Sequence, residues 1–157
     1  MAGTPTIATR TLSRLTVDSS LNALLTGGIY SRELKREGPG ATPNAFAPTP
    51  PYQVRPSAVV RDDGDADDGV GPGGAQFTFV TVWFYAPATD NGKAAIADAV
   101  ELTKGLLIGW RMPTPNGTGA TVENVAGRLG VRDDPVMSGT VVDNVRFQIS
   151  GLWRVIS

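Results

Sequence analysis

The strongest constraint on the fold is one run, residues 76–85, that is apolar on both of its alternating faces. Aromatic and β-branched residues dominate the run, and these residue types favour strands. A strand that is apolar on both sides is covered on both sides, by a helix or by another subunit, so we expect it at the centre of a sheet. One face carries Phe77, Phe79, Trp83 and Tyr85, and the other carries Val80, Val82 and Phe84.

Two helical regions are predicted on either side of this strand. Residues 4–25 have apolar side chains at helical spacing and predict two short helices or one bent helix, and the β-branched Thr16 and Val17 favour a break in the middle. Asp18 or Ser19 is suited to cap the second piece. Residues 91–108 predict a longer helix with Asp90 as its N-cap and a stripe of inward-facing side chains. The stripe consists of Ile96, Val100, Thr103 and Leu107, and Gly109 ends the helix.

Three further segments predict strands. Residues 52–60 read as an edge strand or as a strand carrying a bulge, because Pro56 interrupts them. Residues 120–131 form a short strand, and residues 141–156 alternate cleanly between apolar and polar side chains, which is typical of a strand with one buried and one wet face. The fold class is therefore α+β, an antiparallel sheet of about four strands packed with two or three helices and carrying long loop arms. The length of 157 residues suits a single domain, residues 1–157.

Composition excludes most catalytic chemistry. The chain has no cysteine and no histidine, which removes thiolate nucleophiles, imidazole bases and Cys/His zinc sites. No serine-nucleophile motif occurs, and no spacing supplies a lysine or carboxylate base. The net charge is −1, and the basic residues are scattered along the chain without forming a stripe, which argues against tight nucleic-acid binding. We therefore expect no enzymatic activity, no catalytic or metal-binding residue, no cofactor and no membrane segment.

Two loops are the candidate interaction segments. The first is a proline-rich arm, residues 38–51, in which an isolated Phe46 lies near three closely spaced prolines. A long irregular loop is commonly disordered or an interaction arm, and an aromatic residue in it favours docking against a partner. We expect this arm to become ordered only on assembly. The residues proposed to dock are Phe46, Pro48, Pro50 and Pro51.

The second is an acidic, glycine-rich loop, residues 61–74. Its alternating carboxylates resemble a calcium loop, but Asp68 stands where a sharp turn needs glycine and Gly74 where a bidentate glutamate closes the shell. A solvated turn between strands is the favoured interpretation, also over a phosphate-binding loop, because the glycines follow negative charges and lead into a strand. The carboxylates are Asp62, Asp63, Asp65, Asp67 and Asp68.

The order of these elements resembles the tail terminator, or tail completion, proteins of long-tailed, siphovirus-like bacteriophages. The likeness rests on the helical residues 21–25 leading to Gly28-Ile29-Tyr30, the proline-rich arm, and residues 51–54. It continues through the strand from residue 77, the helix over residues 93–108 and the terminal strand. The long acidic loop and the proline-rich arm both depart from the family pattern.

The resemblance implies a structural virion protein of the phage neck, assembled in the host cytoplasm. Such a protein forms a ring of six copies, ends polymerisation of the tail tube and joins tail to head. Its partners are copies of itself, the tail-tube protein and head-connector proteins, and DNA passes through the ring without specific binding. Acidic side chains facing such a channel would repel phosphate, while the same side chains could equally serve only to keep a loop soluble.

Two alternatives remain open at this point. Another head–tail connector, head-completion protein or tail-tube subunit also suits an extended arm and a two-sided sheet. A small ligand-binding α/β domain is the less favoured alternative, since it requires a deep pocket in the monomer, whereas assembly requires broad interfaces.

Overall fold

The computed structural model describes residues 7–67, 76–112 and 120–150. Its helices are α1 (Ile7–Thr16), α2 (Ser19–Leu24), α3 (Asp90–Leu107) and a short 3₁₀ turn, Pro43–Ala45. Its strands are β1 (Gly28–Tyr30), β2 (Ser57–Asp67), β3 (Gln76–Pro87), β4 (Arg111–Met112), β5 (Ala120–Arg128), β6 (Arg132–Asp133) and β7 (Thr140–Ser150).

One mixed sheet contains all of these strands. Its order is β1-β2-β3-β7-β5-β4, and β6 pairs with β7 off this path. The β1–β2 pair is parallel and the other pairs are antiparallel. The α+β class is confirmed, but the expectation of about four strands was wrong because the sheet has seven. The additional strands β1, β4 and β6 are only two or three residues long, too short to produce a periodic pattern.

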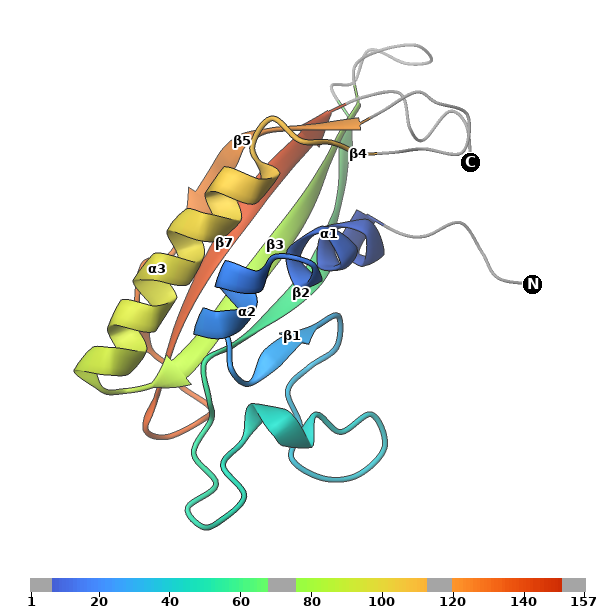
Figure 1. Ribbon diagram of the computed structural model, residues 1–157. Helices are drawn as coiled ribbons and strands as arrows, with labels where there is room; N and C mark the ends of the chain where they lie inside the picture. The colour runs from blue at the N-terminus through green and yellow to red at the C-terminus, as the bar shows by residue number, and fades with distance from the viewer. Residues whose placement is uncertain (1–6, 68–75, 113–119, 151–157) are drawn as a thin grey trace.

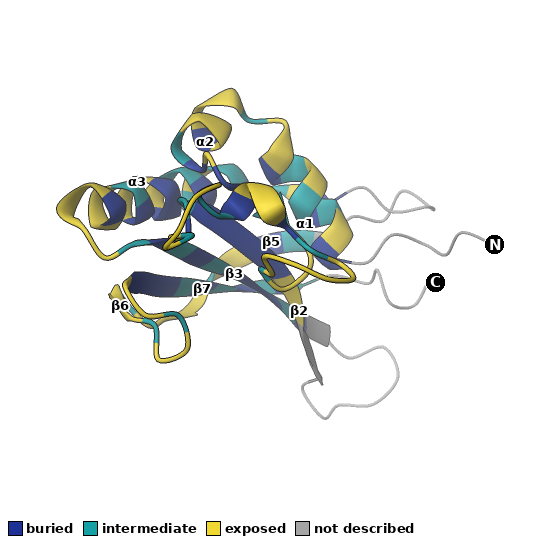
Figure 2. Ribbon diagram, turned by 90° about the horizontal axis from the view of Figure 1, so that it is seen from below, coloured by how far each residue is buried: buried dark blue, intermediate teal, exposed yellow. Residues whose placement is uncertain are grey.

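The three α-helices lie together on one face of the sheet (Figures 1 and 2). Inward-facing side chains of β3 and β7 pack beneath them in one apolar core. The predicted stripe of α3 is confirmed, since all four of its side chains are fully buried. The strand side chains at the centre of this core are Val80, Val82, Phe84, Val145, Phe147 and Ile149.

The helix termini follow local hydrogen bonding. Asp18 caps α2 as predicted, since its Oδ2 accepts a hydrogen bond of 2.8 Å from the backbone N–H of Leu21. The predicted cap of α3 was one residue late. Thr89 is the N-cap, with its hydroxyl oxygen accepting from the N–H of Gly92 at 3.0 Å, and Asp90 is the first helical residue, where its carboxylate favours the positive end of the helix dipole.

The hairpin of β2 and β3 is longer than the sequence pattern indicated. Strand β2 begins directly after Pro56, and it continues through residues 61–67, which were predicted as part of a loop. The expectation of an edge strand was wrong for residues 57–59, because β2 pairs there with β1 as well as with β3. Pairing with β3 shifts register between Asp62 and Asp65, so a bulge interrupts the ladder there. Strand β3, whose residues strongly favour strands, pairs with this aspartate-rich segment and keeps it extended. Residues 68–74 of the predicted loop, and residues 151–156 of the predicted terminal strand, lie outside the described residues.

Gly92 provides a test of the close approach between α3 and the end of β3. A Cβ at this position would lie 2.0 Å from the backbone carbonyl oxygen of Pro87. We expect Gly92→Ala to lower the free energy of unfolding by about 1–3 kcal/mol, because backbone has to shift. Gly105 of the same helix has no atom within 4 Å of such a Cβ, so Gly105→Ala should be neutral or stabilising. Urea denaturation of both variants measures the difference, and equal midpoints would contradict it.

Candidate interaction surfaces

The sheet face opposite the helices is the first candidate surface. Register places Val59, Trp83 and Asn144 in one row across β2, β3 and β7, and Arg61, Thr81 and Arg146 in the next. We call this the open face, because no helix of the described chain covers it (Figure 2). Its exposure is intermediate between that of a buried core face and that of a solvent-exposed polar face, since Phe79, Trp83 and Tyr85 are all half-buried on it.

Aromatic and guanidinium groups are stacked on the open face. The guanidinium carbon of Arg146 lies 3.9 Å from the centroid of the Phe79 ring, a cation–π geometry. Smaller side chains between the large ones are almost fully buried, with Val59 1% and Thr81 4% exposed. Aromatic residues and arginine are the residue types enriched in protein–protein interfaces, and they carry most of the binding energy there. The open face therefore has the composition of a packing surface.

Tyr85 lies at one end of the open face. Burial raises the pKa of its hydroxyl above the ordinary value of 10.0, and the nearby Asp134 carboxylate raises it further. Because the pKa of Tyr85 is higher in the folded state than in the unfolded state, its protonated hydroxyl contributes to stability below about pH 10. This contribution is lost as the pH rises beyond that value. Asp134 follows β6 and Glu33 follows β1, and the charges of both act on Tyr85, so both segments approach this end of the face.

The pH dependence of unfolding tests this environment. We expect the urea midpoint of the wild type to fall as the pH rises above about 10, and Tyr85→Phe to remove part of that fall. Tyr30, whose pKa burial also raises, supplies another part. An unchanged alkaline limb in Tyr85→Phe would show that Tyr85 is not desolvated in the folded protein.

The loop between β1 and β2, residues 31–56, contains the predicted arm and is tied together by its own hydrogen bonds. The N–H of Thr42 donates to the carbonyl of Lys35 at 2.6 Å, and the N–H of Ala47 donates to the carbonyl of Gln53 at 2.8 Å. These bonds close two smaller loops, and the guanidinium of Arg36 lies 4.0 Å from the Tyr52 ring centroid between them. The arm thus has a defined conformation within one chain, in contrast to the expectation that it becomes ordered only on assembly. It ends in a tip that consists of residues 48–51 (Figure 1).

The predicted docking residues fall into two groups. Phe46 is half-buried and forms an isolated antiparallel bridge with Val54, so it belongs to the base of the arm. Pro48, Pro50 and Pro51 are exposed at the tip. The structure therefore separates an anchoring aromatic residue from the prolines that are available to a partner.

Four of the five predicted acidic residues lie on β2. Asp62 is exposed, and its Oδ1 accepts a hydrogen bond of 2.9 Å from the N–H of Ala8, in the first turn of α1. Asp63, Asp65 and Asp67 lie on the remainder of β2, and Asp68 is outside the described residues. Among the side chains that the structure describes, no group of three or more metal-ligating residues occurs.

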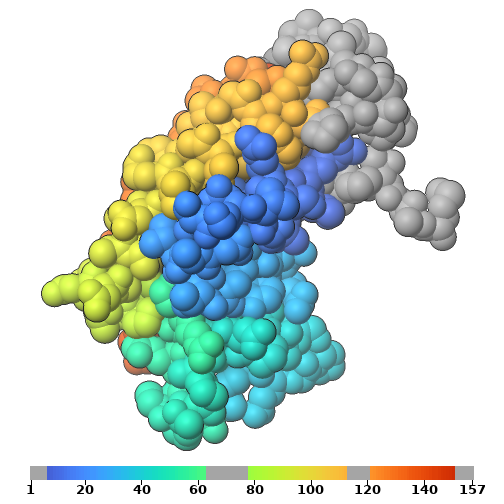
Figure 3. All heavy atoms as spheres, in the orientation of Figure 1, coloured from blue at the N-terminus to red at the C-terminus, as the bar shows by residue number. Residues whose placement is uncertain are grey.

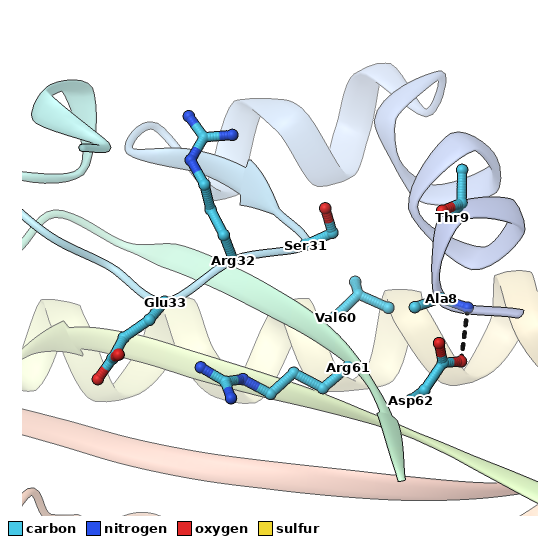
Figure 4. Close-up of a pocket in the computed structure, with 8 residues that line it drawn as sticks. All are labelled: Ala8, Thr9, Ser31, Arg32, Glu33, Val60, Arg61 and Asp62. Atoms are coloured by element: carbon cyan, nitrogen blue, oxygen red, sulfur yellow. Dashed lines mark hydrogen bonds between the residues drawn. The ribbon is translucent and has the colours of Figure 1, made fainter. Parts of the chain in front are cut away.

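A polar pocket of about 420 Å³ lies beside β2 where β1 ends (Figure 4). Arg32 and Arg61 line it, but their side chains point in different directions (Figure 4). Arg32 is already used within the chain, with its Nε donating to the carbonyl of Gly40 at 3.0 Å. The two guanidinium groups therefore do not converge on a common point in this pocket (Figure 4).

A second hollow, of about 670 Å³, is lined by residues of α2 and α3. The atoms of these two segments, blue and yellow in Figure 3, adjoin on the surface. Its lining is mostly apolar, with two carboxylates among the residues that form it. We call it the α2–α3 groove. The lining residues are Ser20, Ala23, Leu24, Asp98, Glu101 and Leu102.

The buried ion pair of Asp143 is a feature that the sequence analysis missed. Asp143 is fully buried, and both Nε and Nη2 of Arg128 lie 2.9 Å from its Oδ2. Its Oδ1 accepts from the N–H of Gly130 at 2.9 Å, so one carboxylate ties the chain after β5 to β7. Its position in the sequence could have predicted its burial, because Asp143, Val145 and Phe147 are alternate residues of β7 and their side chains therefore lie on the same buried face.

Comparisons with known proteins identify the fold. No protein-family model and no curated protein sequence matches the chain. The chain is similar to a solved chain from the virion of a native gene transfer agent particle, with a TM-score of 0.61 and 14% identity, covering 92% of this chain and 93% of that one. A second solved protein, designated by a serial number rather than by a function, has a TM-score of 0.53 at 12% identity, with 92% and 94% covered. The shared fold thus extends over most of each chain.

A search of the described helices for membrane-spanning candidates finds none that is both long and apolar enough.

Proposed function

We propose that this protein is a structural subunit of a phage-like particle, located in its neck, where a ring of copies caps the tail tube. The ring would end tube polymerisation and join tail to head. The observation that carries the proposal is the fold shared, over nearly the full length of both chains, with a component of a gene transfer agent virion. A match of both whole chains, rather than of a common substructure, favours the same kind of building block.

The surfaces described above support a structural role. A two-layer fold with helices on one side leaves an aromatic and guanidinium surface that a neighbouring subunit would bury. Both described hollows are wide and open, whereas ligand-binding domains enclose their ligands in deep pockets. These features favour packing between subunits over binding of a small molecule.

Assembly around DNA gives the acidic residues a role. Asp62 and the three aspartates that follow it on β2 would keep a channel wall from holding the phosphate backbone, because like charges repel at short range. The proposal thus has copies of this chain, the tail-tube protein and head-connector proteins as partners, with DNA passing without specific contacts.

The experiment is to measure the mass of the purified protein by light scattering over a range of concentrations, alone and mixed with purified tail tubes. A discrete ring, or a ring-shaped density at one end of each tube in electron micrographs, is expected. Binding along the whole tube would instead identify a tube subunit, and binding to capsid portals alone a connector. Absence of self-association and of binding to either structure would contradict the proposal.

The open face supplies the matched variants. We expect Trp83→Glu to weaken assembly by about 30-fold or more, the effect of removing an aromatic anchor from an interface. Val17→Glu, at a position that is 80% exposed between α1 and α2, should leave assembly unchanged. Circular dichroism and urea denaturation check that both variants fold. Equal assembly of the two variants would show that the open face is not an interface.

A further inference from the structure

We infer that the proline-rich tip of the arm, residues 48–51, docks into the α2–α3 groove of a neighbouring copy. This inference rests on the proposed function, because it assigns the contact that links one subunit to the next. It concerns surfaces other than the open face, so the two can be tested separately.

The tip is suited to docking because it is both exposed and held in one conformation. Its three prolines are exposed, and the hydrogen bonds from Ala47 to Gln53 and from Arg55 to Ala45, of 2.8 and 2.7 Å, close the base beneath it. Proline fixes the backbone angle φ, so little conformational entropy is lost when such a segment binds.

The groove is complementary to the tip in shape and polarity. It is a wide hollow whose floor includes the apolar side chains of Ala23, Leu24 and Leu102. The projecting tip is uncharged and three of its four residues are prolines, which suits a hollow with an apolar floor. The floor is not covered by any other part of the described chain.

Charge complementarity points to the same pairing. The β1–β2 loop that carries the tip has four basic residues against two acidic ones. The groove is rimmed by Asp98 and Glu101; among the described residues Asp98 is in no ion pair, and Glu101 pairs only with Lys104 on the surface at 3.3 Å. A basic arm approaching an acidic rim gains attraction, while two grooves facing each other would oppose like charges.

The occupant is a second copy because a tip cannot reach the groove of its own chain. The β1–β2 loop extends away from α2 and α3, on the opposite side of β1 (Figure 1). A contact between two different patches, tip on groove, leaves a free tip on one subunit and a free groove on the next. Such heterologous contacts continue from copy to copy until the ring closes.

Engineered cysteines test the contact without background, because the chain contains none. Thr49→Cys places a thiol at the exposed tip, and Ala23→Cys places one in the groove. When the two variants are mixed and oxidised, we expect a disulfide-linked dimer at a yield about ten-fold or more above the control mixture, since docking raises the effective thiol concentration. The control mixture contains Thr49→Cys and Ser13→Cys, which lies on the exposed side of α1.

Charge variants provide a second readout in the same mixture. Adding Asp98→Lys to the groove variant should lower the cross-linked yield by about five-fold, whereas Ala97→Lys, on the same exposed stretch of α3, should not. Each variant's unfolding curve establishes that it is folded.

The outcomes separate this inference from the proposed function. Assembly of the wild type without tip-to-groove cross-links, or with equal cross-linking to Ser13→Cys, overturns the docking inference and leaves the ring intact. Cross-links of Thr49→Cys to itself would indicate two-fold contact between arms and also overturn it. A strict monomer, alone and with tail tubes, overturns both.

Discussion

Replacing Phe147 by alanine is expected to lower the free energy of unfolding by about 3–5 kcal/mol, the cost of deleting a fully buried aromatic side chain. Phe147 is 0% exposed, on a strand that β3 and β5 flank, and it packs under the helices with Val80 and Val82. Domains of this size have a total stability of about 5–15 kcal/mol, so the variant would lose a large share of it. Urea denaturation followed by circular dichroism measures the change.

Phe79→Ala is the matched control for that prediction. Phe79 lies on the neighbouring strand β3 but on the open face, where it is half-buried. Because the same side chain is removed from a partly solvated site, we expect about half of the loss. If both variants were equally destabilised, the open face would have to be as completely buried in the free protein as the core, and it would no longer be a candidate interface.

Arg128→Ala is expected to be destabilising by about 3 kcal/mol or more, because it leaves the buried Asp143 carboxylate without its cation. The Arg128 side chain is 35% exposed while that of Asp143 is 0% exposed, so the carboxylate cannot recover hydration when its partner is removed. The N–H of Gly130 would remain as one hydrogen-bond donor to it. Thermal and urea unfolding of the variant provide the measurement.

The Arg36–Glu37 pair is the control, because it has the same 2.9 Å separation at an exposed site, with side chains 41% and 75% exposed. Arg36→Ala should cost about 1 kcal/mol or less, as exposed ion pairs do. Adding Asp143→Asn to Arg128→Ala should restore part of the loss, since an amide is less costly to bury than a charge. A double variant no more stable than Arg128→Ala would argue against an unpaired charge as the cause.

Long, regular segments could be predicted from the sequence because their periodicity is unambiguous. The central strand, the long helix and its four buried residues, and the break after Thr16 were all confirmed. The short strands could not be predicted, since Gly28–Tyr30 is a strand only because β2 lies beside it. The same applies to residues 61–67, where tertiary pairing with β3 overrides the low strand propensity of aspartate.

The candidate surfaces were predictable only in part. The arm and its prolines stood out by composition, but the role of Phe46 in the base of the arm depends on its bridge to Val54. The α2–α3 groove depends on how two helices that are far apart in the sequence pack against each other, and no local sequence pattern predicts that packing. The open face was predicted in part. The apolar side chains on both faces of β3 indicated that both faces are covered, and the helices cover only one of them.

The edges of the sheet have a consequence for how the free protein behaves at high concentration. The outermost strands β1 and β4 have only three and two residues, so most of each outer edge is formed by the next strand, β2 or β5. Where these strands extend beyond β1 and β4, β2 carries the charged residues Arg61 and Asp62, and β5 carries Glu123 and Arg128. Short and charged edges disfavour the edge-to-edge strand pairing that leads to fibrils. We therefore expect copies of the free chain to remain apart at these edges in concentrated solution, so that any association of copies would use side-chain surfaces instead.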